Sequence, residues 1–350
     1  MSKEYDTIVF IGRFQPLHMG HVAVINQALS LANQVVIVVG SAFSSRSPKN
    51  PFTFAERKDM IEQTFHSEVY YRETLKVVPI SDTKNDDRWI TSVRRAVGSA
   101  FPSVGKVSLI GFGKDESSYY LKLFPDWGSV AAEKYFSLID ATAIRDSFFR
   151  RGSSVRVDMV PEPVAAFMRE FRGHEAYAKM IYYSEYIAKY KKDWENAPYP
   201  PTFVTVDPVR VQSGHVLLVK RKDEPGAGLL ALPGGFLQEG KSLITSVINE
   251  LKEETNISDA KGEIPPAKLA GFIDHSRSRV FDEVNRSSRG RTITHAFFFQ
   301  FPTTRSLFKV KGGSDAAEAA WYPINSLVPE VFFEDHWQIL EEMNVINPKE

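Results

Sequence analysis

The segment from Gln34 to Gly40 is a continuous run of β-branched residues between its polar first residue and its final glycine. A strand in which apolar and polar residues do not alternate is buried on both faces, which is typical of a parallel sheet covered by helices. Shorter apolar runs recur at Thr7 to Ile11, Leu75 to Ile80 and Val107 to Ile110, and helix-like stretches such as Trp89 to Val97 lie between them. This alternation predicts an α/β fold with a parallel sheet in the first half of the chain.

A helix is expected directly after the first strand, because apolar residues recur there at helical spacing. These residues are Val24, Ile25, Ala28, Leu29 and Ala32. In open α/β sheets, ligands bind beyond the carboxyl ends of the strands. The residues that follow Ile11, Gly40 and Ile110 are therefore expected to form a site.

The second half of the chain has a different pattern. A polar, aromatic and helix-like stretch, Tyr186 to Glu195, is followed by a proline-rich hinge. The next expected strands suggest a mixed sheet; they are Thr202 to Val206, His215 to Lys220 and Thr292 to Phe301. A chain of 350 residues accommodates about two domains. We expect domains at residues 1–185 and 202–350, joined by a linker at 186–201.

Composition excludes several classes of protein. The chain has no cysteine, which rules out disulfides, thiolate metal sites and a cysteine nucleophile. Its 43 Lys and Arg balance 43 Asp and Glu, which argues against a nucleic-acid or membrane-surface partner. The first residues are charged, and no apolar run behind them has the length of a signal peptide or a membrane span. A cytoplasmic location is expected.

The residues after the first strand read GRFQPLHMGH from Gly12 to His21. The start of a helix offers unpaired backbone N–H groups and a partial positive charge, both of which attract phosphate. Two imidazoles and the guanidinium of Arg13 add to this attraction. No residue of the segment is a suitable covalent nucleophile, so its chemistry is the stabilisation of charge on a phosphoryl group during transfer.

These residues resemble the HxGH motif of the nucleotidyltransferase superfamily, whose members release pyrophosphate from a nucleoside triphosphate. The longer string is similar to that of the archaeal-type nicotinamide mononucleotide adenylyltransferases. Other segments that resemble this family are Gly40 to Ala42, Asn50 to Thr53, Glu56 to Arg57, Asp82 to Trp89 and Asp140 to Arg145. The resemblance implies a Rossmann-like nucleotidyltransferase domain.

The resemblance also implies roles for individual residues. Contacts with the ATP phosphates during catalysis are implied for Arg13, His18, His21 and Arg145. Substrate-binding positions are implied at Gly12, Phe14, Gln15, Lys49, Asn50, Thr142 and Ile144. Trp89 is implied to stack on the nicotinamide ring, although a core position on an amphipathic helix is the alternative. Asp140 and Ala141 stand where the family has small hydroxyl or glycine residues; because Arg145 and Thr142 remain, weaker phosphate binding is the most that this change is expected to cause.

The loop from Gly111 to Asp115 superficially resembles a dinucleotide-binding glycine motif. It lacks the third glycine and a suitably placed acidic residue for a ribose, so we reject that interpretation. Because the loop follows another expected strand, Gly113 is expected to line the adenosine pocket.

A second motif begins at Gly234 and Gly235 and leads into an expected helix. Glu250, Glu253 and Glu254 share one face of this helix at about 100° per residue. Its adjoining apolar stripe comprises Leu243, Ile244, Val247, Ile248 and Leu251. Carboxylates so close together repel one another, and a hard divalent cation such as Mg²⁺ neutralises them while it also binds diphosphate oxygens. A solvated acidic face is the alternative.

This pattern resembles the Nudix box, which implies an α/β/α sandwich with a mixed sheet. The resemblance implies metal ligands at Gly235, Glu250, Glu253 and Glu254, with Glu254 also catalytic. Lys241 replaces a family glutamate, and Asn249 replaces the arginine that orients a glutamate of the helix. Asn256 replaces a glycine, which is a mild change because asparagine tolerates the left-handed conformation at a helix end.

A basic segment from Arg286 to His295 is either a solvated loop or part of a binding site. It resembles a segment of Nudix proteins that use ADP-ribose, in which basic residues such as Arg289 and Arg291 approach the diphosphate. Asp315 and Glu318 are candidates for a base outside the Nudix box.

Together the two resemblances cover most of the chain and imply a bifunctional nicotinamide mononucleotide adenylyltransferase and ADP-ribose pyrophosphatase. The implied ligands are ATP, nicotinamide mononucleotide, NAD, pyrophosphate and ADP-ribose, with Mg²⁺ as cofactor and Mn²⁺ as an alternative in the Nudix site. A homo-oligomer is compatible with the sequence. Two other hypotheses are a different mononucleotide acceptor, and a C-terminal domain that binds ADP-ribose or NAD as a regulatory module without hydrolysing it.

Overall fold

The computed structural model describes residues 3–65, 73–83, 85–111, 116–132, 139–152, 157–303, 306–313 and 316–346. The chain divides into two compact units, Met1–Ser184 and Glu185–Glu350. Within the described residues, no helix combines the length and the apolar composition needed to cross a membrane.

The N-terminal unit alternates strands and helices. In chain order its elements are β1 (Tyr5–Gly12), α1 (Met19–Leu31), β2 (Ala32–Val39), α2 (Phe54–Phe65), β3 (Leu75–Pro79), α4 (Asp86–Gly98), β4 (Val107–Gly111), the 3₁₀ helix η1 (Glu116–Lys122), β5 (Gly128–Ala131), α5 (Ala141–Phe148), η2 (Val157–Met159) and α6 (Glu162–Phe171). Helix α7 (Glu175–Asp193) follows and spans the boundary between the two units.

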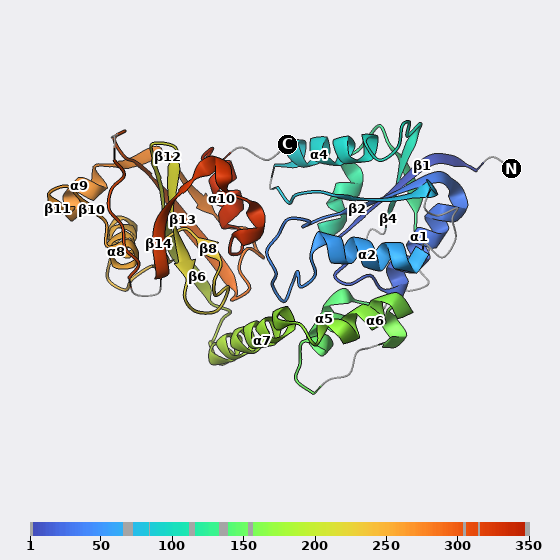
Figure 1. The fold of residues 1–350 in the computed structure, drawn as a ribbon, viewed down its shortest axis with the longest axis horizontal. Coiled ribbons are helices and arrows are strands. Elements are labelled where there is room, and N and C mark those ends of the chain that lie inside the picture. The colour runs from blue at the N-terminus through green and yellow to red at the C-terminus, as the bar shows by residue number, and fades with distance from the viewer. Residues whose placement is uncertain are drawn as a thin grey trace. The chain divides into compact units, whose positions relative to one another are not determined.

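The sheet of this unit has the strand order β3-β2-β1-β4-β5, and all of its neighbouring strands are parallel. Val35 to Val39 are all fully buried, which confirms the strand predicted from the unbroken apolar run. Figure 1 shows α4 on one side of the sheet and α1 and α2 on the other. On the α4 side, Val9 and Val36 pack with Val93 of the helix. The expected α/β fold with a parallel sheet is therefore confirmed.

Helix α1 differs from the prediction only at its end. Ala32, predicted as the last apolar residue of the helix, has an extended backbone (φ −117°, ψ 150°) and is the first residue of β2. Its N–H still bonds to the carbonyl of Ala28, so the helix and the strand meet without an intervening loop. Because β1 and β2 are parallel neighbours, this tight connection places the loops after Gly12 and Val39 at the same edge of the sheet.

The C-terminal unit contains a mixed sheet with the order β12-β13-β6-β7-β14, to which β8 and β9 add at β7 and β6. Its elements are β6 (Thr202–Gln212), β7 (His215–Arg221), β8 (Leu230–Ala231), β9 (Gly235–Phe236), α8 (Leu243–Thr255), β10 (Ser258–Asp259), β11 (Gly262–Glu263), α9 (Pro266–Ala270), β12 (Ile273–Phe281), β13 (Arg291–Gln300), β14 (Ala316–Pro323), η3 (Ile324–Ser326), η4 (Pro329–Val331) and α10 (His336–Glu342). Strands β13 and β6 are parallel, whereas the other paired strands are antiparallel.

Helices α8 and α10 cover opposite faces of this sheet (Figure 1). Val247 and Leu251 of α8 belong to one apolar cluster, and Ile339 and Leu340 of α10 belong to the other. The predicted apolar stripe of α8 is wrong at one position, because Ile244 is 38% exposed. The α/β/α sandwich with a mixed sheet is confirmed.

Candidate functional site

His18 and His21 hold each other in place at the start of α1. Nδ1 of His18 accepts a hydrogen bond from the backbone N–H of His21 at 3.4 Å, and the N–H of His18 donates to Nδ1 of His21 at 3.3 Å. The pair thus forms a reciprocal capping box, and the two rings stack with their centroids 3.6 Å apart. Because Nδ1 accepts in both neutral rings, the ring proton lies on Nε2, the atom that can donate to a phosphate oxygen.

The loop before these histidines is held rigidly by its own buried side chains. Phe14 has a positive φ of 52°, and its ring packs against His21 with centroids 4.8 Å apart. The amide of Gln15 donates to the carbonyl of Phe52 at 2.8 Å and accepts from the N–H of Phe52 at 3.0 Å. Gly12 lies close to this loop, since a Cβ there would stand 3.0 Å from the Phe14 ring. These predicted substrate-binding residues thus shape the loop that carries the histidines.

The guanidinium of Arg57 on α2 joins the loops that follow β1 and β2. Arg57 is 1% exposed and donates to the carbonyl oxygens of Arg13 at 2.7 Å, Gly40 at 2.8 Å and Ser41 at 2.9 Å. Burial lowers the pKa of Arg57 to about 10, and the positive charge of Arg13 acts in the same direction. The clamp fixes the backbone from which Arg13 extends into solvent.

Sequence analysis placed Arg57 in a segment that resembles the family but gave it no role, although the sequence carries a signal for one. Arg57, Met60 and Ile61 are three and four residues apart, the spacing of one helix face, and all three are buried on α2. A charged residue at a core position of an amphipathic helix requires polar partners in the interior. Here these partners are the carbonyl groups at the edge of the sheet.

Arg145 brings α5 to the same loop. It is 6% exposed and donates to the carbonyl of Gln15 at 2.8 Å and to Oγ1 of Thr142 at 3.2 Å. Burial lowers the pKa of Arg145 to about 10, and repulsion from Arg13 adds to this effect. Arg13, Arg57 and Arg145 therefore place three positive charges near the histidine pair. The hydrogen bonds of the two buried arginines go to carbonyl and hydroxyl oxygens. Nearby carboxylates act against the effect of burial: Asp82 raises the pKa of Arg57, and Asp146 and Asp140 raise that of Arg145.

Asp140, where the sequence departs from the family motif, serves as the N-cap of α5. Its carboxylate accepts a hydrogen bond from the N–H of Thr142 at 2.9 Å. A negative cap suits the positive end of a helix, so the departure has a local structural reason. The same charge lies close enough to Arg145 to raise the pKa of that residue slightly, against the dominant effect of burial.

The other residues predicted for this site lie in different surroundings. Trp89 on α4 is half-buried, and its ring centroid lies 5.9 Å from that of Phe124 at the edge of the core. Lys49 is exposed, and Asn50 carries a buried Oδ1 for which the described residues provide no hydrogen-bond partner. Ile144 is 1% exposed and belongs to the interior. Gly113 lies outside the described residues.

In the C-terminal unit, Glu254 of α8 is anchored beneath the glycine loop. Its carboxylate accepts a hydrogen bond from the N–H of Gly234 at 2.8 Å and is 8% exposed. Burial raises the pKa of Glu254 to about 8; this hydrogen bond opposes the shift, while the negative charges of Glu250 and Asp207 add to it. Asp207 on β6 is also buried, which raises its pKa to about 7. An acidic group with a pKa near neutrality is suited to accepting a proton.

Gln238 links the two unusual Nudix positions to Glu250. Lys241 Nζ and Asn249 Nδ2 both donate to Oε1 of Gln238, at 2.7 and 2.9 Å, and Nε2 of Gln238 lies 3.5 Å from Oε1 of Glu250. This chain of contacts orients Glu250 without the family arginine. Gln238 was not predicted, because no sequence pattern shows that Lys241 and Asn249 contact the same side-chain amide. At the end of α8, Asn256 adopts the expected left-handed conformation, with φ 42° and ψ 40°.

The donor set beside the glycine loop fits a hard divalent cation, although it is not a preformed cluster. Glu253 is exposed, and no group of three His, Asp or Glu side chains in the described parts of the chain is arranged to hold a metal. Gly235 nevertheless lies against Glu250, so closely that a Cβ would meet its carboxylate at 2.7 Å. A cation bound by Glu250, Glu254 and the Gly235 carbonyl would offset the repulsion from Glu250 that adds to the effect of burial on the pKa of Glu254.

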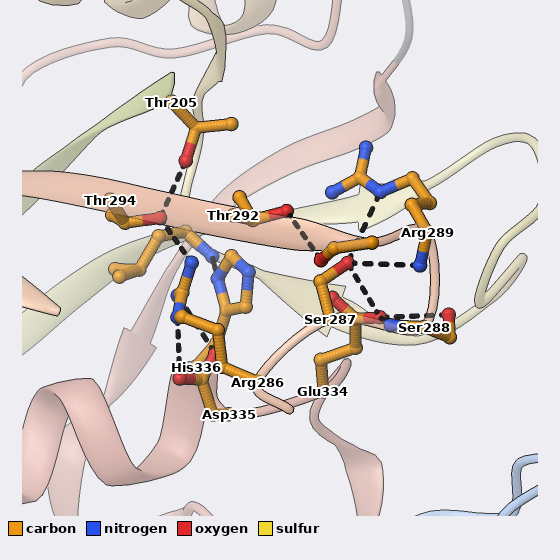
Figure 2. A network of polar contacts seen from close by, with 12 residues as sticks. Thr205, Arg286, Ser287, Ser288, Arg289, Thr292, Thr294, Glu334, Asp335 and His336 are labelled. Atoms are coloured by element: carbon orange, nitrogen blue, oxygen red, sulfur yellow. Dashed lines mark hydrogen bonds and ion pairs between the residues drawn. The ribbon is translucent and has the colours of Figure 1, made fainter. Parts of the chain in front are cut away.

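Figure 2 shows the polar network that holds the basic loop. Arg286 donates from Nε and Nη2 to the carboxylate of Asp335, at 3.0 and 2.9 Å, and from Nη1 to Thr294. Although burial opposes its charge, Asp335 raises the pKa of Arg286. Glu334 accepts from the N–H of Ser288 at 2.8 Å. Arg286 is therefore a structural residue. Arg289 lies at the other end of the network, where its Nε donates to Oγ of Ser287 at 3.4 Å (Figure 2).

His336 connects this network to the glycine loop. Its Nδ1 accepts a hydrogen bond from the N–H of Leu232 at 2.9 Å, two residues before Gly234. Burial lowers the pKa of His336 well below its ordinary value, and the charge of Arg286 adds to this effect, so the ring is neutral. Of the two other predicted residues here, Glu318 on β14 is exposed, and Asp315 lies outside the described residues.

Comparisons with known proteins identify both units. A sequence model of the cytidylyltransferase-like family matches residues 9–146, and a model of the NUDIX domain matches residues 199–343. A nicotinamide/nicotinic acid mononucleotide adenylyltransferase of Acinetobacter baylyi is 38% identical over 177 residues, which cover 51% of this chain and 92% of that protein. An ADP-ribose pyrophosphatase of Methanocaldococcus jannaschii is 34% identical over 139 residues, which cover 40% of this chain and 71% of that protein.

A solved structure resembles the whole chain. It is a bifunctional NMN adenylyltransferase/ADP ribose pyrophosphatase from Francisella tularensis complexed with AMP and a Mn ion, with 33% sequence identity and a TM-score of 0.86. The match covers 97% of this chain and 99% of that one. The resemblances inferred from the HxGH and Nudix motifs are thus confirmed, and the chain belongs to the family of bifunctional NMN adenylyltransferase/ADP-ribose pyrophosphatases.

Proposed function

We propose that the N-terminal unit transfers AMP from ATP to nicotinamide mononucleotide, giving NAD and pyrophosphate. The observation that carries this proposal is the pair of mutually capped imidazoles, His18 and His21, beside three guanidinium groups. Together they form a cluster of hydrogen-bond donors and positive charges, as a triphosphate requires. The similarity to the Acinetobacter baylyi enzyme supports the same reaction.

In this reaction an oxygen of the mononucleotide phosphate attacks the α-phosphorus of ATP. The bond from that phosphorus to the bridging oxygen breaks, and pyrophosphate leaves with the bonding electrons. His18 and His21 donate from Nε2 to phosphate oxygens, while Arg13 and Arg145 offset the charge that develops on them. Mg²⁺ supplies further neutralisation of the phosphate oxygens when it is bound.

The mononucleotide is placed by residues around the edge of the sheet. In our proposal Trp89 stacks on the nicotinamide ring and Thr142 contacts a phosphate. Lys49 lies on the mononucleotide side, and the buried Oδ1 of Asn50 is an acceptor that substrate can satisfy. These assignments predict that NAD formation depends on Trp89 more through KM for the mononucleotide than through kcat.

The test of the first activity is His18→Ala, assayed for NAD formation from ATP and nicotinamide mononucleotide. Removing one donor to developing charge typically costs about 3 kcal/mol of transition-state stabilisation, so we expect a loss of at least about 100-fold in kcat. Hydrolysis of ADP-ribose by the same sample is the control, because it uses the other unit. NAD formation near the wild-type rate in this variant would show that His18 does not act on phosphate.

The C-terminal unit, in our proposal, hydrolyses ADP-ribose to AMP and ribose 5-phosphate. The feature that supports this is the raised pKa of Glu254, held beneath the glycine loop beside Glu250. Water adds to a phosphorus of the diphosphate and the bridging P–O bond breaks, while Glu254 accepts the proton of the water. Similarity to the Methanocaldococcus jannaschii pyrophosphatase supports turnover rather than a role in sensing alone.

A divalent cation is the cofactor that we propose for this unit. Glu250, Glu254 and the Gly235 carbonyl would hold it, with Glu253 as a further ligand after a change of rotamer. The bound cation supplies charge neutralisation at the diphosphate. The related Francisella tularensis structure contains Mn, and we propose that Mg²⁺ also serves.

The test of the second activity is AMP release from ADP-ribose with Mg²⁺ or Mn²⁺, for wild type and Glu254→Gln. We expect the variant to lose AMP release while it keeps NAD formation. Equal rates for the two proteins would exclude Glu254 as the base. An inactive wild type with either metal would mean that the altered motif no longer turns over this substrate.

A further inference from the structure

The segment that joins α7 to β6 forms one wall of a cavity within the C-terminal unit. The cavity has a volume of about 360 Å³, and its lining includes Trp194, Tyr199, Phe203, Arg289 and Arg291. All residues that line it belong to the C-terminal unit. The volume lies within the range of small-molecule sites, which is about 300–1,000 Å³.

Aromatic rings lead from this cavity to the glycine loop. Trp194 is 45% exposed, and its ring meets that of Phe203 edge to face, with the centroids 5.3 Å apart. Phe203 in turn lies 5.7 Å from Phe236, which directly follows Gly235 in the chain. Gly235 is the residue that packs against the carboxylate of Glu250. An exposed indole supported by other rings is a surface on which a flat aromatic ligand can stack.

Positive charge lies beside these rings. The guanidinium carbon of Arg289 lies 5.2 Å from the centroid of the Phe236 ring. Arg291 also lines the cavity, and it donates from Nη1 to the carbonyl of Asp282. Among the described residues, neither arginine forms an ion pair with a carboxylate. Cations at one end of an aromatic pocket suit a ligand that combines a flat base with phosphate groups.

We propose that this cavity binds the purine base of the nucleoside diphosphate, stacked on Trp194, with the diphosphate directed past Arg289 towards Glu250. The inference rests on the hydrolase activity proposed above and adds the subsite for the base. It makes the segment between the domains part of the hydrolase site, because Trp194 precedes residue 199, where the NUDIX match begins. Trp194 then favours substrates that carry a flat base over those that do not.

The experiment compares full-length wild type with Trp194→Ala, Trp194→Phe and Tyr182→Ala. Tyr182 is a matched control because it is an aromatic residue of α7 that is 58% exposed and does not line the cavity. We expect Trp194→Ala to raise KM for ADP-ribose about tenfold, the size typical for the loss of one base-stacking contact, with kcat little changed. Trp194→Phe restores most of the affinity, and Tyr182→Ala behaves like wild type.

Two competitive inhibitors separate stacking of the base from a general loss of structure. Inhibition by AMP weakens about tenfold in Trp194→Ala, because AMP carries the base, whereas inhibition by ribose 5-phosphate is unchanged. If wild type hydrolyses ADP-ribose and Trp194→Ala keeps the KM of wild type, the base lies elsewhere and only this inference fails. If wild type does not hydrolyse ADP-ribose, the hydrolase proposal fails. The proposed base subsite is then tested by measuring AMP binding with calorimetry. The proposal is wrong if AMP does not bind to wild type, or if Trp194→Ala does not weaken AMP binding.

Discussion

Glu254 is a residue whose protonation affects the stability of the C-terminal unit. Its pKa in the folded, metal-free protein is about 8, above its ordinary value of 4.5. Between these values the folded protein binds a proton that the unfolded chain has released, so stability falls as the pH rises. The decrease from this one group is at most about 1.4 kcal/mol per pH unit.

We therefore expect Glu254→Gln to remove part of this pH dependence. Glutamine keeps an oxygen that can accept from the N–H of Gly234, and it carries no charge at any pH. In chemical unfolding with a chelator present, the variant should become more stable than wild type as the pH approaches 8 and similar to it near pH 5. Parallel stability profiles for the two proteins would mean that Glu254 is not protonated in the folded state. Asp207, whose pKa shifts in the same direction, is common to both proteins.

Arg210 is a buried cation whose replacement should stabilise the protein. It is 0% exposed, its guanidinium carbon lies 3.6 Å from the centroid of the Phe301 ring, and none of its nitrogens has a hydrogen-bond partner among the described residues. Burial lowers the pKa of Arg210 well below its ordinary value. An unpaired buried charge is unfavourable, whereas methionine of similar length fills the same space without a polar group.

We expect Arg210→Met to raise the free energy of unfolding by about 1–4 kcal/mol, as found when buried ionic groups are replaced by apolar ones. Thermal or urea unfolding of the two proteins measures this difference. Arg210→Lys is the matched control: it keeps a buried positive charge but loses the flat contact with Phe301, so it should not stabilise. A destabilised Arg210→Met would indicate that the guanidinium has a partner that compensates its burial.

Among the secondary-structure elements, α5 has a cap that affects both folding and substrate binding. Asp140 caps the helix through the N–H of Thr142 but also places a negative charge near Arg145. Asp140→Asn keeps the cap and removes the charge, so it should lower KM for ATP about two- to fivefold, since a charge near a helix terminus is typically worth 0.3–1 kcal/mol.

Asp140→Ala separates the two effects of this side chain. It removes the charge and the cap together, and loss of an N-cap typically costs about 1 kcal/mol of stability. We expect unfolding of this variant at lower denaturant concentration, with Asp140→Asn close to wild type. If KM for ATP is the same in wild type and Asp140→Asn, the carboxylate does not influence the triphosphate.

The strand that the sequence revealed most plainly is β2, which lies between β1 and β3 and whose residues Val35 to Val39 are apolar and buried without interruption. The neighbouring strands of the parallel sheet contain polar residues, such as Asp6 in β1 and Lys76 in β3, and were predicted from shorter apolar runs. β12, in contrast, begins Ile273-Asp274-His275 and continues with alternating serine and arginine, because it is an edge strand with exposed positions. Edge strands often carry charge, which prevents unwanted pairing and also hides them from hydropathy patterns.

The site residues that could be predicted are those in local motifs. His18, His21 and the glutamates of α8 belong to short strings in which spacing alone indicates a shared position. Arg57 and Gln238 could not be assigned in this way, because their partners are carbonyl groups and side chains that the fold brings together from separate segments. Sequence patterns report local geometry, whereas these contacts depend on how loops meet in three dimensions.

At the scale of the whole molecule, each described apolar cluster draws its residues from a single unit. Val36 belongs to a cluster of the N-terminal unit, and Val247 belongs to one of the C-terminal unit. Because these described clusters are separate, we expect two unfolding transitions in calorimetry. Val36→Ala should reduce the free energy of unfolding of the N-terminal unit, and Val247→Ala that of the C-terminal unit. Each reduction should be roughly 1–3 kcal/mol, for the loss of two buried methyl groups.

The assignment of each transition can be checked with the activities. As the temperature rises, NAD formation should be lost at the unfolding transition that Val36→Ala shifts. AMP release should be lost at the unfolding transition that Val247→Ala shifts. A single transition that responds equally to both substitutions would show that the two units unfold as one cooperative body.

The reciprocal hydrogen bonds between His18 and His21 have a consequence for how this motif is inherited. Each imidazole fastens the main chain of the other, so a replacement that lacks an acceptor removes a phosphate donor and at the same time leaves the partner's backbone N–H without its acceptor. Such a mutation is therefore penalised twice. Among the single-base changes of a histidine codon, only those to asparagine or aspartate supply an oxygen that can cap the helix, and they still lose the phosphate donor.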